Sequence, residues 1–446
     1  MSNIVERDRK HIWHPCSQMK DFEQFAPVPV VGAKGNYIQL ANGRKVIDAI
    51  SSWWCKPLGH GHSRLRAALL KQVDQFEHVM LGNTTHEVIV ELSEQLAELT
   101  LNLKKVLFAS DGACAVEMAL KMAVHAQQLK GQTQRTELVY LENAYHGETA
   151  LTLSVSDKDI YKKAYHPLLT DAHCINGLPY VSGCDDPLWK DCSDYWPNIE
   201  TQLNAQADTL AALIIEPIVQ GAGNMRIYSA DLLTRLRQWC DENSVLLIAD
   251  EIMTGLGRTG LPLACNHAGI EPDMLCLGKS LTGGWLPMSA MLTSDHIFNL
   301  FYDDYEHGKN FLHSHTHSGN ALAAAVANET LKVIQDENIV QAAKLLEPKL
   351  LKAMQRVADA TGQLKNVRCI GGIVAADLNT DKPRQGYKVF QKAMQLGAFL
   401  RPLGNTIYWF PPLNIDDNTL GELTKITIEA IITCQMDKKF ARLVEP

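Results

Sequence analysis

The sequence lacks the apolar segments that membrane insertion or export would require. It contains no run of 18 or more apolar residues, the length of a membrane-spanning helix. Its opening residues, MSNIVERDRK, also lack the apolar stretch of a signal peptide, so we expect a cytoplasmic protein. Its 11 cysteines include no C-x-x-C pair of the kind that holds zinc or carries dithiol chemistry. We therefore expect reduced thiols.

The chain also lacks an excess of basic residues. Lys and Arg number 42 against 50 Asp and Glu, which gives a net charge of −8. Such a balance does not favour nucleic acid or an anionic membrane as a partner. Hydrophobic residues make up 46% and charged residues 21% of the 446 residues, values that exclude a disordered or fibrous chain. Small molecules are the expected partners.

Short runs in which every residue is apolar alternate with amphipathic stretches from about residue 105 onwards. Such runs are typical of strands covered on both faces, so the pattern predicts an α/β fold with a mostly parallel sheet between helix layers. We assign a large domain to residues 61–336. The expected strands are 105–108, 138–141, 213–215, 245–248 and 274–277, and the expected helices are 115–129 and 230–241.

The pattern changes beyond about residue 335, where we predict a smaller α+β domain over residues 337–446. Residues 36–40, followed by Asn42-Gly43, predict a β-hairpin. The segment 1–60 shows no helix of its own to pack on, so we expect it to join the small domain. The expected helices there are 340–358 and 387–396, and the expected strands are 369–370, 373–375, 398–401 and 406–410.

Three predicted strand ends carry residues suited to chemistry. The first is followed by ASDGACAVE, where Gly112 at a helix start would let a phosphate approach free N–H groups. The second ends in Asp250, which could be a helix cap, a metal ligand or a counter-charge. The third ends in Lys279 within a glycine-rich turn, where an amine can bind phosphate, form an ion pair or stay reactive through desolvation.

Together the three features match the needs of pyridoxal 5'-phosphate, which requires a phosphate clamp, an acid facing its ring nitrogen and a lysine that binds it covalently. A P-loop nucleotide site is the alternative for a lysine after glycine. That motif requires a glycine five residues before Gly278, and Asp273 stands there instead. The sequence therefore favours the pyridoxal phosphate site.

Residues 246–284 resemble the signature of the class III (ω-) aminotransferases of fold-type I, and the resemblance covers nearly the whole chain. The matching runs are IADE at 248–251, TGLGRTG at 254–260, PD at 272–273 and LGKS at 277–280. Asp250 and Lys279 are 29 positions apart, which is similar to the family's spacing of acid and lysine. The resemblance implies a pyridoxal-phosphate enzyme that transfers an amino group in two half-reactions.

The same resemblance implies roles for three residues around the cofactor ring. Lys279 would bind the cofactor and then move the proton between substrate and cofactor. Asp250 would keep the ring nitrogen protonated, and Tyr145, in NAYHG, would stack on the ring.

The resemblance also implies a phosphate clamp shared between subunits. Gly112 and Ala113 would donate backbone N–H groups to the phosphate. His315 and Thr316, in HSHTH at 313–317, are similar to the segment that reaches the phosphate from a second subunit. The family resemblance thus implies a homodimer with shared active sites.

HIWHP at 11–15, SSWW at 51–54, IEPIVQGAG at 215–223 and LRP at 400–402 resemble more narrowly the biotin-synthesis branch of this family. That branch implies 8-amino-7-oxononanoate as amino acceptor and S-adenosyl-L-methionine as donor. Aromatic walls suit the apolar chain of the acceptor, and a guanidinium suits its carboxylate. The implied substrate-binding residues are Cys16, Trp53, Tyr145, Lys279, Ser314 and Arg401, with Arg401 on the carboxylate.

Four positions depart from the family pattern. Cys16 stands in place of a tyrosine, Ala113 of a serine, His315 of a proline and Glu148 of an aspartate. Ala113 keeps the backbone N–H that the phosphate needs. Cys16 and Glu148 leave open whether S-adenosyl-L-methionine or lysine, as in some relatives, donates the amino group.

Two other functions remain as alternatives at this point. One is another class III enzyme, such as a diamine, ornithine or 4-aminobutyrate aminotransferase or an aminomutase. The SSWW run and Arg401 argue against it. The other is a non-catalytic module of the same fold, which would be free to lose Lys279 and Asp250, yet both are present.

His313, His315 and His317 alternate and would lie on one face of a strand, a pattern that a zinc site can use. Three histidines without a nearby cysteine or carboxylate are more often hydrogen-bonded loop residues. We therefore expect no metal ion.

Overall fold

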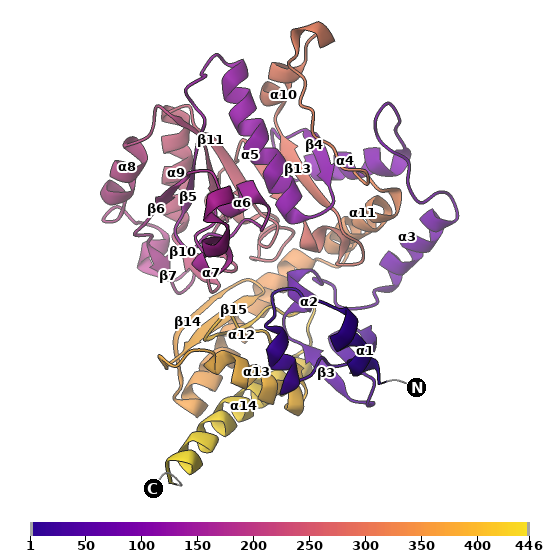
Figure 1. Cartoon of the computed structure of the whole chain (residues 1–446), viewed down its shortest axis with the longest axis vertical. Helices are drawn as coiled ribbons and strands as arrows, with labels where there is room; N and C mark the ends of the chain where they lie inside the picture. Colours follow the sequence, from indigo (N-terminus) through magenta and orange to yellow (C-terminus); the bar gives the residue numbers. More distant parts are fainter. Residues whose placement is uncertain (1–2, 444–446) are drawn as a thin grey trace.

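The computed structural model describes residues 3–443, with side chains to residue 434, and forms two lobes (Figure 1). The upper lobe contains a seven-stranded sheet in the order β4-β13-β12-β11-β8-β5-β6. Its strands are β4 (Lys105–Ala109), β5 (Glu137–Leu141), β6 (His173–Ile175), β8 (Leu210–Ile215), β11 (Leu246–Asp250), β12 (Met274–Leu277) and β13 (Ser289–Thr293).

Strand pairing confirms the mostly parallel sheet. β11 is parallel to β8 and β12, and β5 is parallel to β8 and β6. β13 is antiparallel to both β12 and β4, so β4 runs with the others and β13 alone is reversed within this sheet. The sequence analysis did not predict β13. All the strands predicted for this domain are present, with ends shifted by a few residues.

Both faces of the sheet are buried, which explains the continuous apolar runs. In β8, Ala212 and Ile214 belong to a core cluster shared with α5 (Gly112–Leu129). Leu213 and Ile215 belong to a cluster on the other face, which includes residues of α9 (Ala230–Glu242). The two helices therefore cover opposite faces of the sheet.

The lower lobe combines the two ends of the chain, drawn in indigo and in orange to yellow in Figure 1. Its antiparallel sheet has the order β14-β15-β17, and a second sheet has the order β1-β2-β3-β16. In that second sheet the β2–β3 pair confirms the predicted hairpin. β3 also pairs in parallel with β16, so the N-terminal segment joins the C-terminal lobe. The N-terminal segment does have a helix of its own, α1, which the sequence analysis missed.

The strands of the lower lobe are β1 (Val30–Lys34), β2 (Tyr37–Leu40), β3 (Lys45–Asp48), β14 (Leu364–Ile370), β15 (Ile373–Leu378), β16 (Ala398–Phe399) and β17 (Thr406–Trp409). Its helices are α1 (Ile4–His11), η1 (Met19–Glu23), α2 (Ser51–Trp54), α12 (Ile339–Thr361), α13 (Gln385–Leu396) and α14 (Asp417–Leu443).

The remaining elements belong to the upper lobe and its borders. The strands are β7 (Tyr180–Val181), β9 (Val219–Gln220) and β10 (Arg226–Tyr228). The helices are α3 (Ser63–Val73), α4 (Glu87–Glu98), α6 (Ala150–Ser154), α7 (Asp159–Lys162), η2 (Lys163–Leu168), η3 (Pro187–Trp189), α8 (Trp196–Asn204), η4 (Ala264–His267), η5 (Lys279–Thr282), α10 (Asp295–Phe301), η6 (Tyr305–His307) and α11 (Ala321–Asp336). Over the described part of the chain, no helix has the length and apolarity needed to cross a membrane.

Candidate active site

The parallel strands bring the predicted cofactor residues to one edge of the large sheet. Asp250 is the last residue of β11, and Lys279 follows β12 after a single glycine. Tyr145 lies in the turn after β5, and α5 begins at Gly112 shortly after β4. Because these strands run in the same direction, their carboxyl ends meet at the same edge, where α/β proteins place their sites.

The start of α5 has the free N–H groups that the predicted anion cradle requires. The Asp111 side chain caps the helix by accepting the N–H of Cys114 at 3.1 Å. Gly112 and Ala113 are the first helical residues, whose N–H groups have no carbonyl partner within the helix. A Cβ on Gly147 would lie 2.6 Å from the Cβ of Ala113, so the turn after β5 packs directly against this helix start. The free N–H groups and the helix dipole suit a phosphate.

Asp250 is held by a histidine that the sequence analysis left without a role. Nδ1 of His146 lies 2.8 Å from Oδ2 of Asp250, and the N–H of Ile252 donates to the other carboxylate oxygen at 3.2 Å. The His146 side chain is fully buried, and its Nε2 has no hydrogen-bond partner in the described structure. Its place directly after Tyr145 in the NAYHG motif was the available signal.

Lys279 lies at the start of η5 with a positive φ of 42°. Burial lowers the pKa of its amine, and the carboxylates of Asp250 and Glu216 oppose that shift. Its Nζ lies 4.9 Å from the centre of the Trp54 ring. A lowered pKa increases the fraction of neutral amine, the form that acts as a nucleophile or base.

Glu216, which follows β8, is a second residue that the sequence analysis quoted without a role. Its carboxylate accepts the N–H groups of Tyr145 at 3.0 Å and Gly221 at 2.8 Å. Burial is the main cause that raises the pKa of this carboxyl to about 7. Glu216 therefore ties the turn after β5 to the segment after β8.

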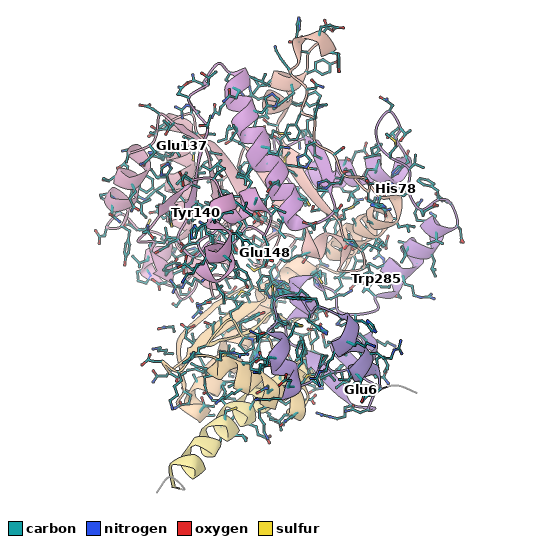
Figure 2. All side chains as sticks on the ribbon, viewed as in Figure 1. Glu6, His78, Glu137, Tyr140, Glu148 and Trp285 are labelled. Carbon is teal, nitrogen blue, oxygen red and sulfur yellow. The ribbon has the colours of Figure 1, made fainter. Side chains whose placement is uncertain are left out.

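The entrance of the site is built where the two lobes meet, at the position of Glu148 in Figure 2. The Tyr145 hydroxyl donates to Glu148 at 2.9 Å, and Sγ of Cys16 lies 3.7 Å from the same carboxylate. Arg401, after β16, donates to the carbonyl of Cys16 at 3.1 Å. Its guanidinium lies 4.3 Å from the centre of the Trp53 ring. The predicted residues Cys16, Trp53, Tyr145 and Arg401 are thus brought together.

The predicted residues Ser314, His315 and Thr316 lie in a different place, in the loop between η6 and α11. His78 Nε2 donates to the carbonyl of Thr316 at 2.8 Å, and His313 Nδ1 lies 3.2 Å from Nζ of Lys121 on α5. These contacts hold the loop against the middle of α5 and against residue 78. They do not bring it to Lys279 of the same chain.

Residues 309–320 contain no strand, so the alternating histidines lie in a loop, the alternative that the sequence analysis favoured. The rings of His313 and His315 lie 5.2 Å apart, whereas His317 packs against His78 at 5.1 Å. The three side chains therefore do not share one face. Within residues 3–434, no group of three or more His, Cys, Asp or Glu residues is arranged to hold a metal ion.

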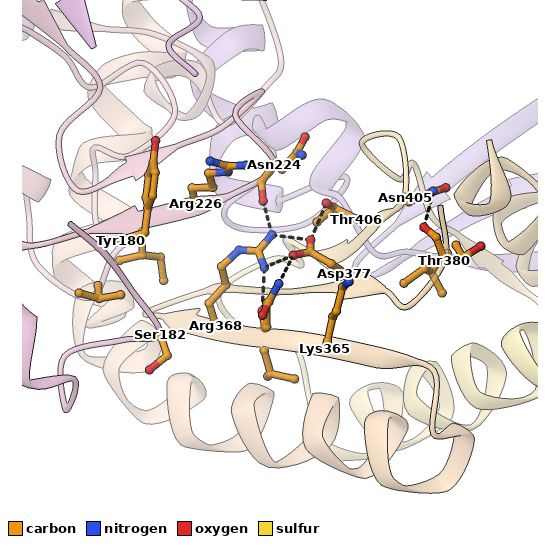
Figure 3. A pocket seen from close by; sticks show the side chains of 15 residues that line it. Tyr180, Ser182, Asn224, Arg226, Lys365, Arg368, Asp377, Thr380, Asn405 and Thr406 are labelled. Atoms are coloured by element: carbon orange, nitrogen blue, oxygen red, sulfur yellow. Dashed lines mark hydrogen bonds and ion pairs between the residues drawn. The ribbon is translucent and has the colours of Figure 1, made fainter. Parts of the chain in front are cut away.

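A cavity of about 510 Å³ lies apart from these residues, between the strands β7 and β10 and the sheet of β14 and β15 (Figure 3). Arg368 spans one wall, where it pairs with Asp377 at 3.0 Å and donates to the carbonyl of Met225 at 2.9 Å. Arg368 is thus already bonded on both sides.

The residues at the sheet edge fit pyridoxal 5'-phosphate on chemical grounds. The start of α5 offers free N–H groups for a phosphate, Asp250 offers a buried carboxylate and Lys279 offers an amine whose pKa is lowered. These are the three groups that this cofactor needs.

Comparison with known proteins agrees with this geometry. The chain belongs to the class III aminotransferases, the family whose sequence pattern matches residues 19–431. It is 39% identical to the adenosylmethionine-8-amino-7-oxononanoate aminotransferase of Helicobacter pylori, over 92% of this chain and 93% of the relative.

Two solved structures share the fold. The first is the crystal structure of adenosylmethionine-8-amino-7-oxononanoate aminotransferase from Methanocaldococcus jannaschii, with a TM-score of 0.89, 30% identity, and coverage of 96% of this chain and 98% of that one. The second is an amine transaminase from an uncultivated Pseudomonas species in its PLP-bound form, with a TM-score of 0.86, 29% identity, and coverage of 95% and 99%. These likenesses confirm the predicted family and fold.

Proposed function

We propose that this class III aminotransferase uses pyridoxal 5'-phosphate to aminate 8-amino-7-oxononanoate to 7,8-diaminononanoate in biotin synthesis, with S-adenosyl-L-methionine as donor. The shared name of relatives that are 31–39% identical supports this substrate pair. One observation carries the proposal: an amine at the inner end of the site, Lys279, and a guanidinium at its entrance, Arg401, each lie against a tryptophan ring.

The residues that would hold the cofactor are those at the sheet edge. Gly112 and Ala113 would bind its phosphate, Asp250 would face its ring nitrogen, Tyr145 would cover its ring and Lys279 would bind it covalently. When bound, the cofactor supplies a carbonyl carbon that accepts amines and a ring that accepts electrons from the substrate carbon.

The protein's own groups would then control charge and protons. Asp250 would face the ring nitrogen and favour its protonated form, and His146 fixes the orientation of that carboxyl group through the 2.8 Å contact. The Lys279 amine, with its lowered pKa, would take a proton from the donor carbon and return one to the acceptor carbon.

The entrance suits a long apolar chain that ends in a carboxylate. Trp53 and Tyr145 offer aromatic walls, and the guanidinium of Arg401 already lies against Trp53 at the outer end. Ser314 would complete the pocket from a second subunit.

Lysine as the amino donor is a second candidate, because the entrance carries a carboxylate. Glu148 is exposed and accepts the hydroxyl of Tyr145, so it could receive a second positive charge on the donor. Both S-adenosyl-L-methionine and lysine carry such a charge, which is why the donor must be tested directly.

We also propose a homodimer in which His315 and Thr316 complete the partner's phosphate site. The position of this loop supports it, since its contacts are with Lys121 and His78 and its Leu312 is 83% exposed. Mixing Lys279→Ala and Thr316→Ala subunits tests the shared site. If each active site draws on both chains, two inactive variants should regain activity when mixed, whereas sites built from one chain would stay inactive.

The substrates are tested by two half-reactions in sequence. Holoenzyme is mixed with S-adenosyl-L-methionine or with lysine, and the absorbance of the bound cofactor is followed. 8-Amino-7-oxononanoate is then added, and the product is identified by mass. We expect the first donor to change the band and the acceptor to restore it. If only lysine changed the absorbance band, lysine would be the amino donor. If 8-amino-7-oxononanoate did not restore the band, the protein would be another class III aminotransferase.

A further inference from the structure

Residues 51–54, the SSWW run labelled α2, form a single turn that is left-handed. Their φ angles are 50°, 46°, 71° and 72°, and none of the four is glycine. An L residue in this conformation is strained, because its Cβ approaches the following carbonyl oxygen. Consecutive residues keep such a conformation only where their surroundings hold them there, and such strain concentrates at functional sites.

One buried carboxylate holds this turn. Asp48, at the end of β3, has an exposed fraction of 0% and accepts the N–H and the hydroxyl of Ser52 at 3.0 and 2.7 Å. It also accepts the N–H of Ile50 at 3.3 Å, and Nε2 of His60 lies 2.8 Å from its Oδ2. Three of these bonds hold Ile50 and Ser52, at the start of the turn.

The turn carries two consecutive rings to the two cations of the site. The Trp53 ring lies under the guanidinium of Arg401, and the Trp54 ring lies under the amine of Lys279. Nε1 of Trp54 also donates to the Tyr408 hydroxyl at 3.0 Å, which ties this ring to β17. The turn therefore places one ring at the inner end and the other at the entrance.

We propose that Asp48 is a positioning residue for substrate: by clamping the left-handed turn, it holds Trp53 against Arg401 and Trp54 against Lys279, the two cations that would face the carboxylate and the amino-accepting end of the substrate. The nature of that substrate rests on the proposed function. Asp48 touches neither substrate nor cofactor, and it acts through the two rings.

The first test compares Asp48→Asn with Asp377→Asn. Asp377 is a matched control because its carboxylate also accepts several side-chain hydrogen bonds, from Arg368, Asn366 and Thr406, but outside the site. We expect Asp48→Asn to raise KM for 8-amino-7-oxononanoate about tenfold, the effect of losing a charge-assisted hydrogen bond, and to change kcat less. Asp377→Asn should lower Tm without that change in KM.

A double-mutant cycle separates positioning from a general structural role. If Asp48 acts through Trp53, Asp48→Asn should raise KM less than about twofold in a Trp53→Ala background. Effects that multiply in the double variant would overturn the proposal, and so would an unchanged KM in a folded Asp48→Asn protein. If Asp48→Asn does not fold, Ser52→Ala removes the 2.7 Å bond to Asp48, together with the weaker 3.4 Å contact of the same hydroxyl with His60, and should raise KM in the same way, by a smaller factor.

A measurement without substrate tests the positioning role of Asp48 independently of the proposed function. The π face of Trp54 favours a positive charge at Lys279, so its displacement in Asp48→Asn should lower the pH midpoint of the bound cofactor's absorbance change by roughly 0.5 unit. If wild-type enzyme does not aminate 8-amino-7-oxononanoate but the midpoint still shifts in Asp48→Asn, the proposed substrate is wrong and the positioning role of Asp48 is supported. An unshifted midpoint, with a normal KM, removes the positioning role alone.

Discussion

The inner end of the site and its entrance are built in different ways. At the inner end, Asp250 and Lys279 follow neighbouring strands of one sheet, so strand order alone places them together. At the entrance, Cys16, Trp53 and Arg401 come from segments up to 385 positions apart and meet through a backbone carbonyl and a ring. The fold itself therefore provides the proposed cofactor site, whereas contacts between distant segments provide the proposed substrate site.

Burial follows the same division. Glu216 and Asp250 at the inner end have exposed fractions of 6% each, and Glu216 has a raised pKa because of its burial. At the entrance, Trp53 is 39% exposed, and Glu148 is exposed as well. Substitutions at the inner end should therefore change chemistry and stability, and those at the entrance should mainly change substrate affinity.

The largest expected effect is at Lys279. Lys279→Ala should lower kcat at least about 1,000-fold, because it removes both the covalent link to the cofactor and the proton carrier. Steady-state rates and the absorbance of the bound cofactor measure both losses. Lys56→Ala is the matched control, since Lys56 is also a lysine with a pKa lowered by burial, and its amine donates only to the carbonyl of Gly284. Turnover by Lys279→Ala would contradict the assignment.

The next effect is on stability and depends on pH. Glu216 has a pKa raised to about 7 by burial, above the value of about 4.3 for a free glutamate. Its contribution to stability is fully present below pH 4.3 and is lost as the pH rises to 7, because unfolding then releases a buried carboxyl that can ionise in water. Glu216→Gln removes this loss.

Urea unfolding at pH 5 and pH 8, with and without the substitution, measures the difference. We compare the free energy of unfolding of Glu216→Gln with that of wild type at each pH. The difference, variant minus wild type, should be larger at pH 8 than at pH 5 by on the order of 3 kcal/mol. Glu251→Gln is the matched variant: burial also raises the pKa of Glu251 to about 7, and its carboxylate accepts the N–H groups of Ala264 and Cys265. If the difference between variant and wild type were the same at both pH values, Glu216 would not be a buried carboxyl with a raised pKa.

The hydrophobic pattern alone placed Asp250 and Lys279 at strand ends, whereas the entrance residues followed only from the family resemblance, and there is a physical reason for this difference. Continuous apolar runs indicate strands buried on both faces, and the residue at the end of each run then lies at a known edge of the sheet, as Asp250 and Lys279 do. The hydrophobic pattern does not predict the side chains that support these residues, such as His146 and Glu216, because their partners depend on how separate loops pack. The left-handed turn at 51–54 was equally invisible, since nothing in SSWW indicates a positive φ.

A moderate effect is expected at the entrance. Arg401→Ala should raise KM for 8-amino-7-oxononanoate about 10- to 100-fold, the effect of losing a charge-assisted hydrogen bond to a carboxylate, with little change in kcat. Arg384→Ala is the control, because Arg384 also lies against an aromatic ring, Tyr387 at 4.7 Å, but pairs with Asp21. An unchanged KM in Arg401→Ala would mean that the carboxylate binds elsewhere.

The smallest effect is expected at Cys16, although its side chain departs from the family pattern. Its contact with Arg401 uses the backbone carbonyl, which every substitution keeps, and its φ of 47° is a conformation that glycine adopts without strain. Cys16→Ala and Cys16→Gly should therefore leave KM for the acceptor within about twofold, since a surface change without a buried partner costs little. Steady-state kinetics with both substrates measure this. If KM for the acceptor rose tenfold, the thiol itself would be a substrate contact, and the entrance would depend on that side chain as strictly as the inner end depends on Lys279.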